Sequence, residues 1–185
     1  MKIANRLLKR FDYKLLRMSR HGPELHMSAA LARLASRQIE VGTVVDIGAS
    51  NGAWSRVAAQ HFPEARLVAI EALEERRAEL DALRQDLPGF DFLIAAASEH
   101  HGGSVDLNVA DDLDGSTVGG QTAGDTRSVP TVSIDAMVAE QNLPGPYLLK
   151  FDTHGFEVPI LDGARETLQA TSALIVEVYN FPITD

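Results

Sequence analysis

Two acidic residues that each follow an apolar segment are the first candidates for chemistry. Asp46 opens the segment DIGASNGAW, in which Gly48 and Gly52 are separated by three residues. A strand that leads through such a turn into a helix brings bare backbone close to a ligand at the strand's carboxyl end. Glu71 ends the next expected strand, 66–70, at the place where nucleotide-binding sheets put an acid that binds ribose hydroxyls.

The composition of this turn limits the ligand. It has no Lys, which a P-loop requires, and Ser50 stands where a dinucleotide fingerprint has its second glycine, so a phosphate group is disfavoured. A carboxylate at Asp46 suits an ammonium group and one at Glu71 suits hydroxyls, and S-adenosylmethionine carries both groups. The alternative is an ordinary strand-to-helix turn without a ligand. The predicted cofactor-binding residues are Asp46, Gly48, Ala49, Ser50, Asn51, Gly52 and Glu71.

A second group of polar residues follows later strands. Asp152 and His154 come after the expected strand 147–151, which places them at the same sheet edge as the first two acids. Asp152 could orient an acceptor hydroxyl, hold the cofactor ammonium or join a metal site, or it caps the following helix. His154 suits proton abstraction near neutral pH, unless it serves in binding or in capping the loop. Glu177 either faces the crevice or is an expensive buried charge. We predict these three residues as catalytic, and the metal ligands stay undetermined.

Five segments give the chain a resemblance to a known family. VVDIGASNGAWS, LVAIEALEE, VPTVSID, LLKFDTHGFEVPILDGA and ALIVEV occur in an order and spacing that resemble FkbM-type methyltransferases. The resemblance implies a class I S-adenosylmethionine-dependent enzyme, typically an O-methyltransferase acting on hydroxyls of sugars, glycans or polyketides. His154 departs from the family pattern, in which that position is often Glu or Gln. Related folds seat the adenine near Ala96 and Ala97, whose small side chains leave room for a flat ring.

The pattern of apolar residues predicts an α/β fold with a Rossmann-like parallel sheet and helices on both faces. Expected strands are 43–47, 66–70, 91–96, 147–151 and 173–178, with a half-exposed strand at 104–109. Expected helices are 28–39, 52–61, 73–86 and 156–169, with a short helix near Asp135. The Gly- and Asp-rich stretch 111–125 is predicted to be a long mobile loop.

Two parts are expected along the chain. Residues 1–40 form a basic, amphipathic helical arm, and residues 41–185 form the methyltransferase core. A class I sheet normally has seven strands, and the resemblance implies a sixth and a seventh strand after 173–178 that the sequence does not contain. We therefore expect a core that is incomplete at its C-terminus, with an edge strand that lacks its usual cover.

The amino-acid composition limits the kinds of protein that this chain can be. The chain has 185 residues, 45% of them hydrophobic, and no Cys, which suits one globular domain without disulfides or thiolate metal sites. It lacks a long apolar run and the apolar core of a signal peptide, so we expect a cytoplasmic protein.

Charge is distributed unevenly. Residues 1–20 hold seven basic residues and one acidic residue, so with a net charge of −9 for the whole chain the remainder carries −15. An acidic body argues against nucleic acid as a partner. The basic arm lies on an anionic membrane surface or docks on a partner protein, or it packs on its own acidic domain.

The leading hypothesis is thus a methyltransferase that acts on a hydroxyl of a small molecule, lipid or glycan. One alternative is a non-catalytic cofactor-binding or scaffold domain recruited through its N-terminal helix. A nicotinamide-dependent oxidoreductase is the other alternative, and the missing middle glycine disfavours it. The sequence determines neither the acceptor nor the oligomeric state.

Overall fold

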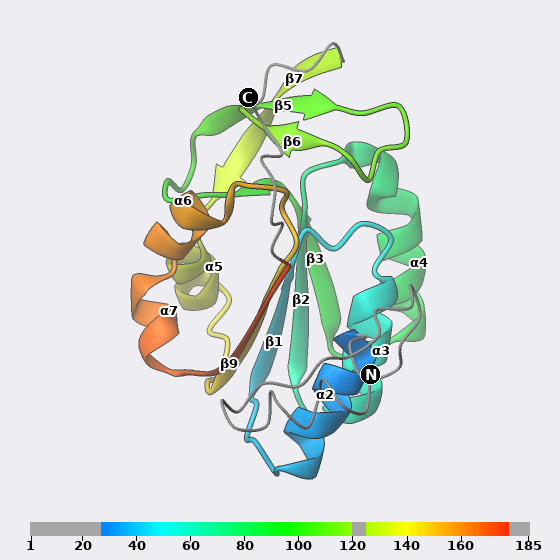
Figure 1. Cartoon of the computed structure of the whole chain (residues 1–185), viewed down its shortest axis with the longest axis vertical. Helices are drawn as coiled ribbons and strands as arrows, with labels where there is room; N and C mark the ends of the chain where they lie inside the picture. Colours follow the sequence, from blue (N-terminus) through cyan, green and yellow to red (C-terminus); the bar gives the residue numbers. More distant parts are fainter. Residues whose placement is uncertain (1–26, 120–124, 178–185) are drawn as a thin grey trace, which may run out of the picture.

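The apolar segments pair into a five-stranded parallel sheet (Figure 1). The computed structural model describes residues 27–119 and 125–177. The sheet has the strand order β3-β2-β1-β8-β9, with parallel pairing throughout. Its strands are β1 (Thr43–Ile47), β2 (Arg66–Glu71), β3 (Phe90–Ile94), β8 (Tyr147–Phe151) and β9 (Thr171–Val176). The predicted α/β, Rossmann-like fold is confirmed.

Alternate residues of each strand serve two separate cores, because successive side chains point to opposite faces of a sheet. Val45 and Ile47 of β1 pack with Leu149 of β8 in one core, while Val44 and Leu148 pack in the other. Helices lie on both faces of the sheet (Figure 1). The first core lies under α5 (Ile134–Glu140), α6 (Glu157–Asp162) and α7 (Arg165–Gln169), and the second lies under α2 (Met27–Ser36), α3 (Ala53–His61) and α4 (Arg77–Asp86), which η2 (Glu74–Arg76) precedes.

Helix α2 packs on the same core as the sheet. Leu31 is fully buried and lies in one apolar cluster with Val44 and Ala58. The expected helix over 28–39 therefore forms, although it ends at Ser36. The amphipathic helix expected within residues 1–20 lies outside the described residues, so the domain boundary near residue 40 stays a prediction.

A second, smaller sheet lies across the carboxyl ends of the main strands (Figure 1). Its strand order is β4-β7-β5-β6. The bounds are β4 (Ala96–Ala97), β5 (Ser104–Val109), β6 (Thr117–Val118) and β7 (Asp125–Val132). The predicted loop over 111–125 was thus partly wrong, since 117–118 pair with β5 and a strand begins at Asp125. Residues 120–124 lie outside the described part of the chain.

Two predicted elements are each divided in two. The strand expected over 91–96 separates into β3 and β4, which belong to different sheets. The helix expected over 156–169 separates into α6 and α7 at Gly163. A Cβ atom at Gly163 would collide with the backbone of Ser98, so the chain is held against another segment where a continuous helix would otherwise run.

The strand β9 forms the outer edge of the main sheet in the described residues, where it pairs with β8. The expectation of missing sixth and seventh strands concerns residues after 177, which lie outside the described residues. Among residues 27–119 and 125–177, no helix is long and apolar enough to cross a membrane.

Both glycines of the turn after β1 have structural reasons to be glycine. Gly48 has φ +73°, and a Cβ atom there would collide with the backbone carbonyl oxygen of Asp152. Gly52 has φ +77°, and a Cβ atom there would lie 2.5 Å from a methyl group of Leu83 on α4. The spacing of the two glycines therefore reflects the close packing of this turn against the loop after β8 and against α4.

We expect Gly48→Ala to lower the free energy of unfolding by about 2–4 kcal/mol, because it adds left-handed backbone strain to an overpacked contact. Gly102→Ala is the matched control, since Gly102 has φ +76° but nothing within 4 Å of the added Cβ atom. That variant should lose only about 1 kcal/mol. Urea unfolding of both variants measures the difference, and equal losses would contradict the close approach at Gly48.

Candidate functional site

A cavity of about 490 Å³ lies between the carboxyl ends of the main strands and the small sheet. Its floor includes Ile47 and Ile70 from the ends of β1 and β2, and its roof includes Leu107 and Val118 from β5 and β6. Ligand pockets in proteins have volumes of roughly 300–1,000 Å³ and combine apolar walls with a few polar groups. The volume of this cavity falls within that range, and its lining combines apolar residues with a few polar groups.

Most of the predicted site residues line this cavity. They are Gly48, Ser50, Asn51, Glu71, Ala96, Ala97, Asp152, His154 and Glu177. Three others lie elsewhere: Asp46 is 1% exposed beneath the turn, Ala49 is buried in a core cluster, and Gly52 packs against α4. The turn therefore presents Gly48, Ser50 and Asn51 to the cavity, while its other predicted residues serve in packing.

Asp46 forms a buried ion pair with Lys150. The Lys150 Nζ atom lies 3.0 Å from Asp46 Oδ1 and donates a hydrogen bond of 2.7 Å to the Gly48 carbonyl. The hydroxyl of Ser55 donates to Asp46 Oδ2 at 2.7 Å. Because both oxygens of Asp46 face protein partners below the cavity, the structure places this carboxylate as a support for the turn and not in the cavity wall, where we expected it to meet an ammonium group.

Glu71 lies at the tip of β2 in the cavity wall. Its two carboxylate oxygens accept backbone N–H groups from Ser50, at 2.7 Å, and from Leu73, at 2.9 Å. Burial raises the pKa of Glu71, and the backbone donors of Leu73, Ser50 and Ala72 together with the charge of Arg76 oppose that rise. A carboxylate has about four acceptor positions, and these backbone donors do not fill all of them, so Glu71 can also accept a hydrogen bond from a ligand's hydroxyl group.

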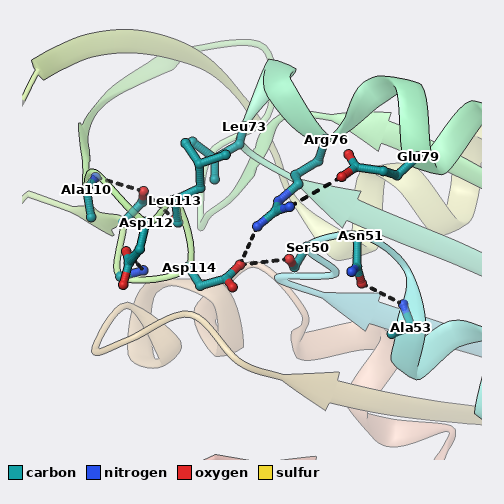
Figure 2. Close-up of polar contacts among 12 residues, drawn as sticks. Ser50, Asn51, Ala53, Leu73, Arg76, Glu79, Ala110, Asp112, Leu113 and Asp114 are labelled. Carbon is teal, nitrogen blue, oxygen red and sulfur yellow. Dashed lines mark hydrogen bonds and ion pairs between the residues drawn. The ribbon is translucent and has the colours of Figure 1, made fainter.

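Asp114 joins the loop before β6 to the turn after β1, as Figure 2 shows. Its Oδ1 atom lies 2.6 Å from Arg76 Nη2 and accepts a hydrogen bond of 2.9 Å from the Ser50 hydroxyl. Asp112 Oδ1 accepts the Gly115 N–H at 3.0 Å and so shapes this loop. The prediction of a long mobile loop over 111–125 missed this contact, since an Asp in a polar stretch carries no signal for a partner 64 residues away.

The three predicted catalytic side chains meet at the other side of the cavity. Asp152 and His154 follow β8, and Glu177 follows the end of β9. His154 Nε2 lies 3.7 Å from Asp152 Oδ1, and Asp152 Oδ2 lies 3.4 Å from Lys150 Nζ. The Glu177 N–H donates to the Phe151 carbonyl at 3.0 Å, which fixes this residue beside the loop.

The charge of Asp152 is set by its neighbours. Burial raises its pKa, but a hydrogen bond with Glu177, the positive charge of Lys150 and the neighbouring His154 outweigh burial and hold the pKa of Asp152 below its usual range. Asp152 is therefore ionised at neutral pH. An ionised carboxylate beside an imidazole can orient a hydroxyl group and assist removal of its proton.

Comparison with known proteins gives the following matches. The family model of the methyltransferase FkbM domain matches residues 46–185. The methyltransferase FkbM from Methylobacillus flagellatus KT has a similar fold, with a TM-score of 0.53 and 21% identity over 78% of this chain and 34% of that chain. This chain thus spans about a third of the length of that protein.

A SAM-dependent methyltransferase from Aquifex aeolicus matches with a TM-score of 0.43 and 14% identity over 97% of this chain and 78% of that chain. A search of curated protein sequences gave no match.

Lys150→Met should lower the free energy of unfolding by about 3–5 kcal/mol, because it leaves the buried Asp46 carboxylate without its cation. The double variant Lys150→Met/Asp46→Asn should recover at least about 1 kcal/mol of this loss, since Asn keeps an acceptor for Ser55 but carries no charge. Urea unfolding checks both values. A loss below about 1 kcal/mol for the single variant would mean that the ion pair does not hold this edge together.

Asp114→Ala should loosen the loop before β6. Because the Asp114 side chain is 67% exposed, each of its contacts contributes at most about 1 kcal/mol, so we expect amide exchange at 113–118 to accelerate roughly two- to fivefold. Hydrogen exchange with mass spectrometry measures this change. Asp111→Ala, in the same loop, is the control, and an equal acceleration in both variants would contradict the contact.

Proposed function

Because the chain belongs to the methyltransferase FkbM domain family, we propose that it binds S-adenosylmethionine and transfers its methyl group to a hydroxyl group of an acceptor. The observation that carries the proposal is the cavity wall at the end of β2. There Glu71 lies beside the small residues Ala96 and Ala97 at the carboxyl edge of a parallel sheet. Such an edge is where α/β sheets bind nucleotides.

The cavity residues fit the groups of this cofactor. The remaining acceptor positions of Glu71 suit ribose hydroxyls, and Ala95, Ala96 and Ala97 leave a flat space in the wall beside it. In this arrangement Asp46 acts through Lys150, which holds the Gly48 carbonyl, and does not contact the cofactor. Leu107 of β5 and Val118 of β6 line the cavity on the side opposite the main sheet.

The acceptor would enter on the side of Asp152, His154 and Glu177. When bound, S-adenosylmethionine supplies an electrophilic methyl group. The chain's own residues must align the acceptor oxygen with that group and take up the hydroxyl proton. Asp152 and His154 lie in the same wall of the cavity and can do both.

The acceptor class follows from the family and not from the cavity. We propose a hydroxyl group on a sugar, glycan, lipid or polyketide-like molecule, because FkbM-type enzymes typically act on such groups. The proposed contact of residues 1–20 with a membrane surface or a partner protein rests on their sequence, since they lie outside the described residues.

Isothermal titration calorimetry with S-adenosylhomocysteine tests cofactor binding. We expect binding by the wild-type chain and a loss of at least tenfold in affinity for Glu71→Ala, because a removed hydrogen-bonding carboxylate costs about 1.5–3 kcal/mol. Glu71→Gln, which keeps one acceptor oxygen, should lie between them. The control is Glu64→Ala, an exposed position outside the cavity.

Two outcomes would reject the proposal. One is the absence of S-adenosylhomocysteine binding with thermal melting that shows a folded chain. The other is tighter binding of NAD than of S-adenosylhomocysteine, which would favour an oxidoreductase. Where the cofactor binds, mass spectrometry of products from a deuterated methyl donor and a panel of sugar, lipid and polyketide hydroxyls identifies the acceptor. Cofactor binding without any methylated product across the panel would support the scaffold alternative.

A further inference from the structure

Three side chains of metal-ligand type converge in the cavity wall. Asp152, His154 and Glu177 each offer one ligand atom, and these atoms all lie within 4.8 Å of one another. We propose that the three residues bind one divalent first-row transition-metal ion. All three line the cavity, so an ion held by them keeps open coordination positions toward the space where the proposed acceptor enters.

The geometry of His154 fits a metal ligand. Its Nδ1 atom lies 3.4 Å from the carbonyl oxygen of Ser116, while its Nε2 atom faces Asp152. Metal-binding histidines usually donate the proton of one ring nitrogen to a carbonyl or carboxylate, which leaves the lone pair of the other nitrogen for the ion. The contact with Ser116 therefore aims Nε2 into the cluster.

The backbone of His154 supports the same interpretation. Its φ angle is +54°, in the left-handed region that few non-glycine residues adopt. Such strain persists where the surrounding structure requires it and is common at functional sites. Here Glu157 holds the loop, since its Oε1 atom accepts hydrogen bonds of 3.1 Å from the Thr153 hydroxyl and from the Gly155 N–H.

The Asp152 carboxylate lies between the buried cation of Lys150 and the imidazole of His154. Asp152 turns Oδ2 toward Lys150, at 3.4 Å, and Oδ1 toward His154, at 3.7 Å. Oδ1 is therefore the Asp152 oxygen that faces the proposed histidine ligand.

The donor set selects the kind of ion. One imidazole nitrogen with two carboxylate oxygens suits Mn²⁺, Fe²⁺, Co²⁺ or Zn²⁺, whereas Mg²⁺ and Ca²⁺ prefer oxygen ligands alone. Bonds of about 2.0–2.2 Å place tetrahedral ligand atoms roughly 3.4 Å apart, close to the 3.7 Å between His154 Nε2 and Asp152 Oδ1. The three ligand atoms lie within 4.8 Å of one another, so the side chains would have to move closer together to bind one ion.

The ion would have a use in the proposed reaction, and this consequence rests on the proposed function. A divalent cation that binds the acceptor hydroxyl lowers the pKa of that hydroxyl and fixes its oxygen. His154 would then act as a ligand and not as the base, the hydroxyl proton would pass to solvent water, and the acceptor oxygen would take the methyl group as its bond to the sulfonium sulfur breaks. Metal binding itself is a property of the three side chains and can be measured without cofactor or acceptor.

The test is Co²⁺ binding to the full 185-residue chain after treatment with a chelator, without S-adenosylmethionine. Titration followed by visible absorption and calorimetry should show one Co²⁺ per chain with ligand-field bands. His154→Ala and Glu177→Gln should each weaken binding at least tenfold. The matched control is His101→Ala, which removes a partly exposed histidine that pairs with Glu140 and should leave affinity unchanged.

The outcomes separate this inference from the proposed function. A wild-type chain that binds S-adenosylhomocysteine but not Co²⁺, Mn²⁺ or Zn²⁺ overturns the metal site alone. Metal binding without S-adenosylhomocysteine binding supports the site and counts against the proposed function. Equal loss in the His154→Ala and His101→Ala variants, or unchanged binding in His154→Ala, overturns the assignment of the ligands. His154→Ala and Glu177→Gln chains that still bind S-adenosylhomocysteine show that lost metal binding is not lost folding.

Discussion

The buried ammonium group of Lys150 holds together the edge of the sheet on which the site is built. It contacts the carboxylate of Asp46, the carbonyl of Gly48 and the carboxylate of Asp152, and its side chain is 3% exposed. An ammonium group removed from water is stable only with such partners. One charge therefore fixes the ends of β1 and β8 and the loops that follow them.

The acidic residues at this edge of the sheet have two different roles. Asp46 lies below the turn and neutralises Lys150, whereas Glu71 and Asp152 lie in the cavity wall. Lys150 also lies 5.9 Å from the centre of the Trp54 ring, so the first residues of α3 pack against the same charge. The support for the site is thus built from β1, β8 and α3. The polar groups that face the cavity come from the end of β2 and from the loops that follow β1 and β8.

The small sheet completes the cavity. Its strands come from segments between β3 and β8, and it places Leu107 and Val118 over the carboxyl ends of the main strands. Asp114 and Ser116 connect this roof to opposite sides of the site, the first to Ser50 and Arg76 and the second to His154. The cavity is therefore completed by a segment that is not part of the parallel sheet.

The main strands, the order of strands and helices along the chain, and the sheet edge at which the polar residues gather could be predicted from the amino-acid sequence. These features depend on local periodicity and on the rule that parallel strands end at one edge. Three other features arise only in the folded chain: β7 begins at Asp125, Gly163 interrupts a helix, and Asp46 faces Lys150 and not the cavity. Each of these outcomes depends on a partner that is distant in the sequence, such as Ser98 for Gly163 or Lys150 for Asp46, and no local pattern encodes such a partner.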